Sequence, residues 1–103
     1  MSKTISGMIQ ECHNIAKEKG FWEKERNVGE MLMLIVSELG EAIEAHRHGH
    51  LGLLKKDTFE DELADTAIRL FDMCGGLGID LEKQIEWKMS FNKTREKLHG
   101  KTY

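Results

Sequence analysis

The sequence predicts an all-α domain of four helices, and three observations support this prediction. The 103 residues include no proline, the residue that helix interiors tolerate least. Apolar residues recur at intervals of three and four, and no stretch shows the alternation that is typical of a strand. Glycines separate four such stretches with short connectors, which favours a helical bundle or half of one, and the length allows a single domain over residues 1–103.

The first two helices are expected in the N-terminal half of the chain. The first covers about 4–19, where apolar residues follow the helical spacing until Gly20 ends it. The second begins near Asn27, a favourable N-cap, and continues to His48, with Gly49 as its C-terminal stop.

Two further helices are expected in the C-terminal half. The third begins after Asp57 or Thr58, either of which can cap it, and it is expected to end at Gly75-Gly76. The fourth has Asp80 as its N-cap and continues to about Leu98.

Composition excludes several classes of protein. Hydrophobic residues make up 40% and charged residues 32%, which is ordinary globular usage. The net charge of −3 argues against binding to nucleic acid by bulk positive charge. Two cysteines without metal-type spacing fit a reducing compartment, and the longest apolar run, residues 31–36, is far short of the roughly 20 residues that cross a bilayer. We therefore expect a cytoplasmic protein with neither nucleic acid nor membrane as its partner.

Two acidic side chains lie on the apolar side of the second helix. At 100° per residue, Glu38 falls inside the apolar arc and Glu41 on its edge, whereas Glu44 faces water. A carboxylate on a buried face is costly unless it is paired or coordinated. Either each acid pairs with an Arg or Lys from another helix, or a cation lies between them.

The third helix repeats this spacing with Glu62 and Asp65, which flank its apolar side. Taken alone, this pair fits a solvated acidic face. Two such pairs on successive helices, however, offer four oxygen donors that suit Mg²⁺ or Mn²⁺. Zinc would require His or Cys among its ligands.

The ordered set of acids resembles the MazG-like all-α nucleoside triphosphate pyrophosphohydrolases, the family that includes the dimeric dUTPases and dCTP pyrophosphatases. Its E-x-x-E mark reads Glu38 to Glu41 here, and after a spacer over 42–61 its E-x-x-D mark reads Glu62 to Asp65. Ser37 stands where fuller versions of the motif carry another Glu, which counts against a larger metal cluster.

The resemblance implies a Mg²⁺-dependent enzyme that cleaves a nucleoside triphosphate between its α and β phosphates. In the family, the catalytic metal ligands would be the four acids of the motif, Glu38, Glu41, Glu62 and Asp65. One of these acids, or Glu44, would accept the proton of the attacking water. We expect a homodimer or homotetramer, because two helices carry large apolar faces beside their acids.

Candidate substrate contacts come from three parts of the chain. Lys88, Asn92 and Arg95 form one stripe of the fourth helix and match a K-x-x-x-N-x-x-R stretch of small family members, which implies phosphate binding. The alternative is an amphipathic helix whose last turns reach water. Arg69, which follows the second acid pair, is a further candidate.

Two aromatic or imidazole side chains are candidates for contact with the base. Related enzymes place an aromatic in the connector that holds Trp22, although such a residue is otherwise usually a hydrophobic plug. His48 lies where relatives often have an aromatic near the base. His46, His48 and His50 are spaced by two and so cannot share one metal site on a helix.

Two other classes of protein compete with the enzyme. A di-iron bundle needs two E-x-x-H motifs, and only Glu96 to His99 matches. The alternative that remains is a non-catalytic oligomerisation or regulatory module of the same fold, in which the acids are only surface charge.

Overall fold

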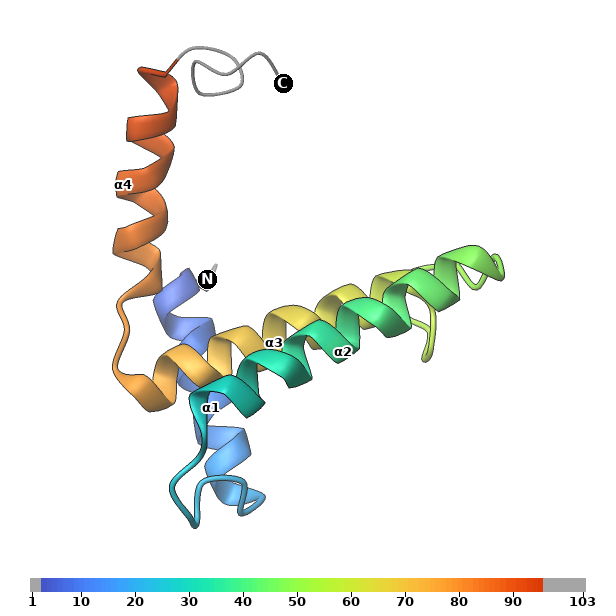
Figure 1. Ribbon diagram of the computed structural model, residues 1–103, viewed down its shortest axis with the longest axis horizontal. Coiled ribbons are helices and arrows are strands. Elements are labelled where there is room, and N and C mark those ends of the chain that lie inside the picture. The colour runs from blue at the N-terminus through green and yellow to red at the C-terminus, as the bar shows by residue number, and fades with distance from the viewer. Residues whose placement is uncertain (1–2, 96–103) are drawn as a thin grey trace.

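The computed structural model describes residues 3–95, and all of its regular elements are α-helices (Figure 1). They are α1 (Ile5–Glu18), α2 (Val28–Arg47), α3 (Phe59–Leu77) and α4 (Leu81–Lys93). The predicted all-α class is confirmed for the described residues. The predicted end of the fourth helix near Leu98, and the E-x-x-H match at residues 96–99, lie outside them.

Each helix begins at a side-chain cap. The caps are Thr4, Asn27, Thr58 and Asp80, and in each case the side-chain oxygen accepts a hydrogen bond from the backbone N–H three residues later. Asn27 and Asp80 were predicted as caps, and Thr58 is the one of the two predicted alternatives that caps α3.

The predicted end of the third helix at Gly75-Gly76 is wrong. The helix continues to Leu77 and is closed by Gly78, which adopts the left-handed conformation. The two earlier glycines permit close packing instead: a Cβ at Gly75 would lie 2.6 Å from Cβ of His13, and a Cβ at Gly76 would collide with the indole of Trp22. Glycine is therefore required at these positions by a neighbouring segment rather than by a turn.

The helices form a hairpin with one crossing helix and one projecting helix (Figure 1). α2 and α3 run antiparallel side by side, and α1 packs across α3 near the start of α2. The small core lies where these three helices meet and includes Ile9, Ala16, Met31, Met73 and Cys74. α4 meets the beginning of α1, where the backbone N–H of Ser6 donates to Glu82, and it has no buried residue. Within one chain, therefore, the four helices do not close into a bundle.

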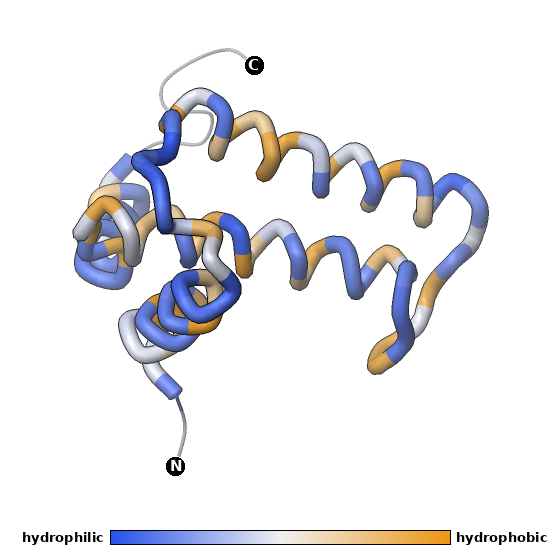
Figure 2. The backbone as a smooth tube through the Cα atoms, turned by 90° about the horizontal axis from the view of Figure 1, so that it is seen from below, coloured by the Kyte–Doolittle hydropathy of each residue, from blue (hydrophilic) through white to orange (hydrophobic). Residues whose placement is uncertain are grey.

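Much apolar surface lies open on the described chain. Hydrophobic positions recur along both helices of the hairpin and at the loop that joins them (Figure 2). Several large apolar side chains of α2, among them Leu32, Leu39 and Ile43, are exposed. None of the helices within residues 3–95 combines the length and apolar character that crossing a membrane requires.

Replacement of Gly76 by alanine tests the close contact between α3 and the connector. The added methyl group collides with Trp22, so we expect Gly76→Ala to destabilise the protein by about 1–3 kcal/mol, as overpacking typically does. Urea unfolding followed by circular dichroism measures this change. Gly40→Ala is the matched control, since no atom lies within 4 Å of its added Cβ. Equal stability of the two variants would contradict the packing described here.

Candidate metal and substrate site

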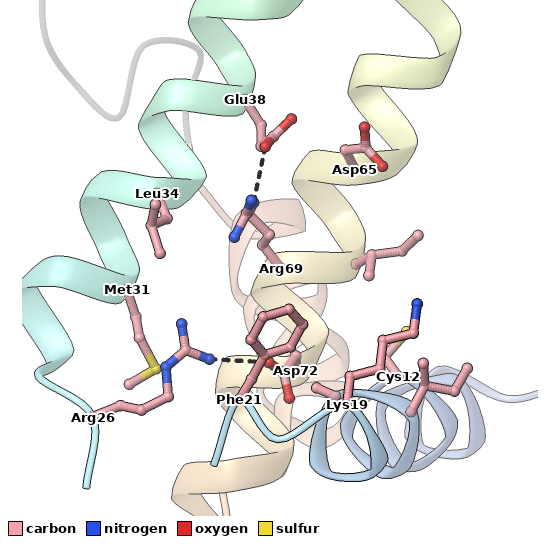
Figure 3. A pocket seen from close by; sticks show the side chains of 13 residues that line it. Cys12, Lys19, Phe21, Arg26, Met31, Leu34, Glu38, Asp65, Arg69 and Asp72 are labelled. Carbon is pink, nitrogen blue, oxygen red and sulfur yellow. Dashed lines mark hydrogen bonds and ion pairs between the residues drawn. The ribbon is translucent and has the colours of Figure 1, made fainter. Parts of the chain in front are cut away.

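Three carboxylates from two helices converge between α2 and α3. Glu38, Glu62 and Asp65 can each offer one oxygen such that all three oxygens lie within 4.8 Å of one another. Glu62 is buried, and the other two are half-buried. The i, i+3 spacing places Glu62 and Asp65 one turn apart on α3. The packing of the hairpin brings Glu38 of α2 opposite Asp65 (Figure 3). We call these three residues the acid cluster.

The acid cluster carries more negative charge than its surroundings accommodate. The pKa of Glu62 is raised from 4.5 to about 6, first by burial, then by a hydrogen bond shared with Glu38 and by the charges of neighbouring acids. Burial and the charge of Glu38 also raise the pKa of Asp65, although Arg69 and Lys56 act in the opposite direction. A cation between these carboxylates would relieve this repulsion.

Arg69 is the cationic side chain that contacts the acid cluster. Its Nε donates to Oε1 of Glu38 at 2.9 Å, across the α2–α3 hairpin (Figure 3). For Glu38, therefore, the alternative in which the acid pairs with an Arg or Lys of another helix is realised. Among residues 3–95, neither Glu62 nor Asp65 has a cationic nitrogen within 4.0 Å. The one ion pair leaves two of the three carboxylates uncompensated.

The fourth acid of the motif, Glu41, lies outside the acid cluster. Its side chain is exposed, and its carboxylate does not belong to the set within 4.8 Å. Its charge nevertheless contributes to the raised pKa of Glu62. The structure thus brings together three of the four predicted ligands, and Glu41 as a ligand stays a prediction.

A cleft of about 520 Å³ extends from the acid cluster between α1, α2 and α3. Glu38, Asp65 and Arg69 lie at one end, and Phe21 and Arg26 lie at the other (Figure 3). Its walls are mainly apolar and are formed by Cys12, Ile15, Ala16, Met31, Leu34 and Ile68. This size and lining are typical of sites for small molecules.

Asp72 holds the connector between α1 and α2 against this cleft. Its side chain is buried, and its Oδ1 accepts a hydrogen bond from Nε1 of Trp22 at 2.9 Å and lies 3.0 Å from Nδ1 of His13. Its Oδ2 accepts a longer one, at 3.4 Å, from Arg26. These contacts hold Trp22 and Arg26 of the connector against α3, and Phe21 and Arg26 line the cleft.

Sequence reasoning missed Asp72, Phe21 and Arg26. Asp72 lies opposite the apolar side of its own helix, which is typical of a solvated residue, and it is buried only by contacts with His13 and Trp22 from other segments. The adjacent aromatic residues Phe21 and Trp22 of the connector were the signal in the sequence. The prediction chose Trp22 as the base contact, whereas Phe21 is the one that lines the cleft.

The two predicted base contacts lie away from the cleft lining. Trp22 is half-buried; its ring packs over Gly76 and meets His13 edge-on at 5.0 Å between centroids. This environment is that of a hydrophobic plug. His48 is exposed at the end of α2, where its Nε2 lies 3.2 Å from Oε2 of Glu44. Contact of either residue with a base stays a prediction.

The basic stripe of α4 does not reach the cleft within one chain. Lys88, Asn92 and Arg95 are exposed, and none of them lines the cleft. Nζ of Lys88 and the guanidinium carbon of Arg95 instead lie 5.1 and 5.2 Å from the ring centroid of Phe91. A phosphate-binding role for these three residues stays a prediction.

The raised pKa of Glu62 predicts a pH-dependent contribution to stability in the absence of divalent cations. Because the folded state binds this proton more tightly than the unfolded state, stability is lost as the pH rises from about 4.5 through about 6. The Glu62→Gln variant mimics the protonated side chain. We expect the free energy of unfolding of the wild type, relative to this variant, to fall over that range with a linkage of up to about one proton. Urea unfolding at a series of pH values measures it, and a constant difference would contradict the raised pKa.

Comparison with known proteins returned no match. No family model matches the chain, and no similar curated protein or solved structure was found.

Proposed function

We propose that this protein is a Mg²⁺-dependent nucleoside triphosphate pyrophosphohydrolase, which releases a nucleoside monophosphate and pyrophosphate. The observation that carries the proposal is the acid cluster of Glu38, Glu62 and Asp65, of which Glu38 and Asp65 line one end of a cleft large enough for a nucleotide. The order and spacing of the acids, which resemble the MazG-like motif, support the same reaction.

The donor set of the acid cluster fits magnesium. It consists of carboxylate oxygens alone, which hard divalent cations prefer, and the mutual repulsion of the acids favours a bound cation. Glu38, Glu62 and Asp65 would hold the ion, with Glu41 as the predicted fourth ligand and Mn²⁺ as a possible substitute. When bound, the ion supplies Lewis-acid polarisation of a phosphate oxygen and lowers the pKa of a bound water.

The cationic side chains that line the cleft would bind the phosphate groups that the metal does not contact. Arg69 lies beside the acid cluster, and its guanidinium can turn from Glu38 to phosphate oxygens, which it binds in a two-pronged geometry. Lys19 and Arg26 add positive charge farther along the cleft, and Phe21 offers a flat apolar surface to a base. In this proposal the metal ligands lie at one end of the cleft, Arg69 lies beside them, and Phe21 lies at the other end.

The acceptor of the water's proton lies within the acid cluster in this proposal. Glu44, the other predicted candidate, contacts Arg47 and His48 on an exposed side of α2 and does not line the cleft. Glu38 and Asp65 of the cluster line the cleft in which the phosphates would bind.

One observation favours the second candidate function, a non-catalytic helical module. The ion pair between Arg69 and Glu38 gives the most central acid of α2 a structural partner without any metal. A degenerate member of such a fold would retain this pair and bind no nucleotide.

A nucleotide screen separates the two functions. The purified protein is incubated with each of the four ribo- and four deoxyribonucleoside triphosphates, with and without Mg²⁺, and the products are identified by ion-exchange chromatography. We expect monophosphate and pyrophosphate from at least one nucleotide, only with the metal. Inactivity on all nucleotides, together with no heat of Mg²⁺ binding in calorimetry, would establish the non-catalytic module instead.

Removal of one metal ligand tests the assignment of the acid cluster. We expect Asp65→Asn to reduce kcat/KM for the active nucleotide by at least about 100-fold, because an uncharged amide holds the cation much less tightly. Glu44→Gln, a carboxylate on the same hairpin outside the cluster, is the matched control and should retain activity. Wild-type turnover by the Asp65→Asn variant would refute the ligand assignment.

Replacement of Arg69 tests the phosphate contact. We expect Arg69→Ala to raise KM about tenfold with a smaller change in kcat, which corresponds to the loss of one charge-assisted interaction with bound substrate. Steady-state kinetics measure both constants. Arg47→Ala removes an exposed arginine that pairs with Glu44 away from the cleft, and it should leave KM unchanged. An Arg69→Ala variant with wild-type KM would exclude the phosphate contact.

A further inference from the structure

The carboxylate of Glu38 takes part in two different interactions at the end of the cleft. It belongs to the acid cluster, whose three carboxylates each offer an oxygen within 4.8 Å of the others. Its Oε1 also accepts a hydrogen bond of 2.9 Å from Nε of Arg69, and this contact joins α2 to α3 (Figure 3). The ion pair and any metal ion held by the acid cluster therefore share one carboxylate.

Arg69 also lies close to a second member of the acid cluster along its own helix. It follows Asp65 by four residues on α3, and this spacing places the two side chains one turn apart on the same side of a helix. Both of them line the cleft. The side chain of Glu38 is 15% exposed, whereas that of Arg69 is 42% exposed. The acid is thus enclosed by the hairpin, and the guanidinium has room to move.

The charge of Arg69 is permanent, and this property makes the residue a competitor of a metal ion. A guanidinium does not lose its proton in proteins, so Arg69 relieves its repulsion of a nearby cation only by moving away. A divalent ion doubles that repulsion relative to a monovalent one, and a half-buried site screens it less than bulk water does. Arg69 and a divalent cation therefore cannot both pair closely with Glu38 without a cost in free energy.

The acids that line the cleft offer Arg69 no other partner once it leaves Glu38. Three acids line the described cleft, and two of them, Glu38 and Asp65, belong to the acid cluster. The third, Asp72, already accepts hydrogen bonds at both of its carboxylate oxygens, one of them from Arg26. A displaced guanidinium would therefore present its N–H groups to an anion in the cleft.

We propose that Arg69 is the internal counter-ion of the metal-free acid cluster, and that it competes with Mg²⁺ for Glu38 and turns into the cleft when the metal binds. The inference deepens the proposed function and rests on the metal site of that proposal. The coupling is reciprocal, so the metal weakens the ion pair as much as the ion pair weakens metal binding. The protein would thus bind the metal first and the triphosphate second, because the guanidinium becomes available to phosphate only after it has left Glu38.

Removal of Arg69 would then have opposite effects on the two ligands. The metal should bind more tightly to the free protein because its competitor is gone, whereas the triphosphate should bind more weakly because a phosphate contact is lost. A purely structural ion pair predicts another result. Its loss would loosen the contact between α2 and α3, and the acid cluster would hold a metal no more tightly than before. The sign of the change in metal affinity distinguishes the two roles.

Calorimetric titration of the metal-free protein with Mg²⁺ alone tests the proposal. We expect Arg69→Gln, which removes the charge, to lower the Kd for Mg²⁺ at least about fivefold. Arg69→Lys retains the positive charge and should keep a Kd within about twofold of that of the wild type. Because Arg69 is partly exposed, both variants should retain the helical circular dichroism spectrum. A Kd that is unchanged or raised in Arg69→Gln would overturn the proposal.

Arg47→Gln is the matched control for this titration. It removes the charge of an exposed arginine that pairs with Glu44 on α2 and does not line the cleft. Its Kd for Mg²⁺ should equal that of the wild type. An equal fall in Kd in Arg47→Gln and Arg69→Gln would show an effect of net charge alone and would count against competition at Glu38.

The Nε–H group of Arg69 reports its release directly and without any nucleotide. In ¹⁵N-labelled protein, this resonance is identified by its absence from the spectrum of Arg69→Lys. We expect saturating Mg²⁺ to shift the resonance and to speed its exchange with water, since the hydrogen bond to Glu38 is broken. The Nε–H resonance of Arg47 should not move. An Arg69 resonance that keeps its position in the metal-bound protein would exclude the release.

Failure of this proposal and failure of the proposed function give different results. Tighter Mg²⁺ binding by Arg69→Gln in a protein that hydrolyses no nucleotide would refute the enzyme and support the counter-ion role. Hydrolysis of a nucleotide by a protein whose Mg²⁺ affinity does not respond to Arg69→Gln would do the reverse. Absence of Mg²⁺ binding in the wild type and in Arg69→Gln alike would overturn both.

Discussion

The repulsion among carboxylates between α2 and α3 is the constraint on which the rest of this structure depends. Glu38, Glu62 and Asp65 converge from two helices that must pack closely to make a core, and only one cation of the described chain, Arg69, contacts them. Burial would normally exclude such groups, and the raised pKa of Glu62 expresses that cost. Arg69 pairs with Glu38 alone, so the other two carboxylates add no ion pair to the stability of the hairpin, and the metal proposed above would supply the missing positive charge.

Asp72 shows how a second buried acid is accommodated when its partners are supplied. Its carboxylate is buried like that of Glu62, but the indole of Trp22 and the guanidinium of Arg26 donate to it, and His13 lies within hydrogen-bond distance. The contrast distinguishes, within one helix, a buried acid whose hydrogen-bond donors are supplied by the chain from one that no cationic nitrogen of the described chain contacts. It also explains the cleft, because these contacts bind the connector to α3 and leave Phe21 free to form its wall.

The sequence was sufficient for those features that depend on a single helix. Apolar spacing and capping residues predicted the four helices. Of the four acids that the i, i+3 spacing singled out, Glu38, Glu62 and Asp65 meet, whereas Glu41 does not join them. Features that depend on contact between segments were not predictable in this way. Gly75 and Gly76 looked like a helix end because their close neighbours, His13 and Trp22, are distant in sequence. The hydrogen bond from Trp22 to Asp72 likewise joins residues that are distant in sequence, and no local pattern indicates it.

The position of α4 follows from the same distinction between local and long-range information. At 100° per residue, Lys88, Asn92 and Arg95 lie on one side of α4. This prediction depends only on the helix itself and not on what the helix packs against. The Gly78 that closes α3, however, turns the chain away from the hairpin, so that α4 meets α1 and its basic end lies apart from the acids. A helix of 13 residues with no buried side chain depends on packing for its stability. The placement of α4 therefore depends on contacts between distant segments, which the local pattern of one helix does not specify.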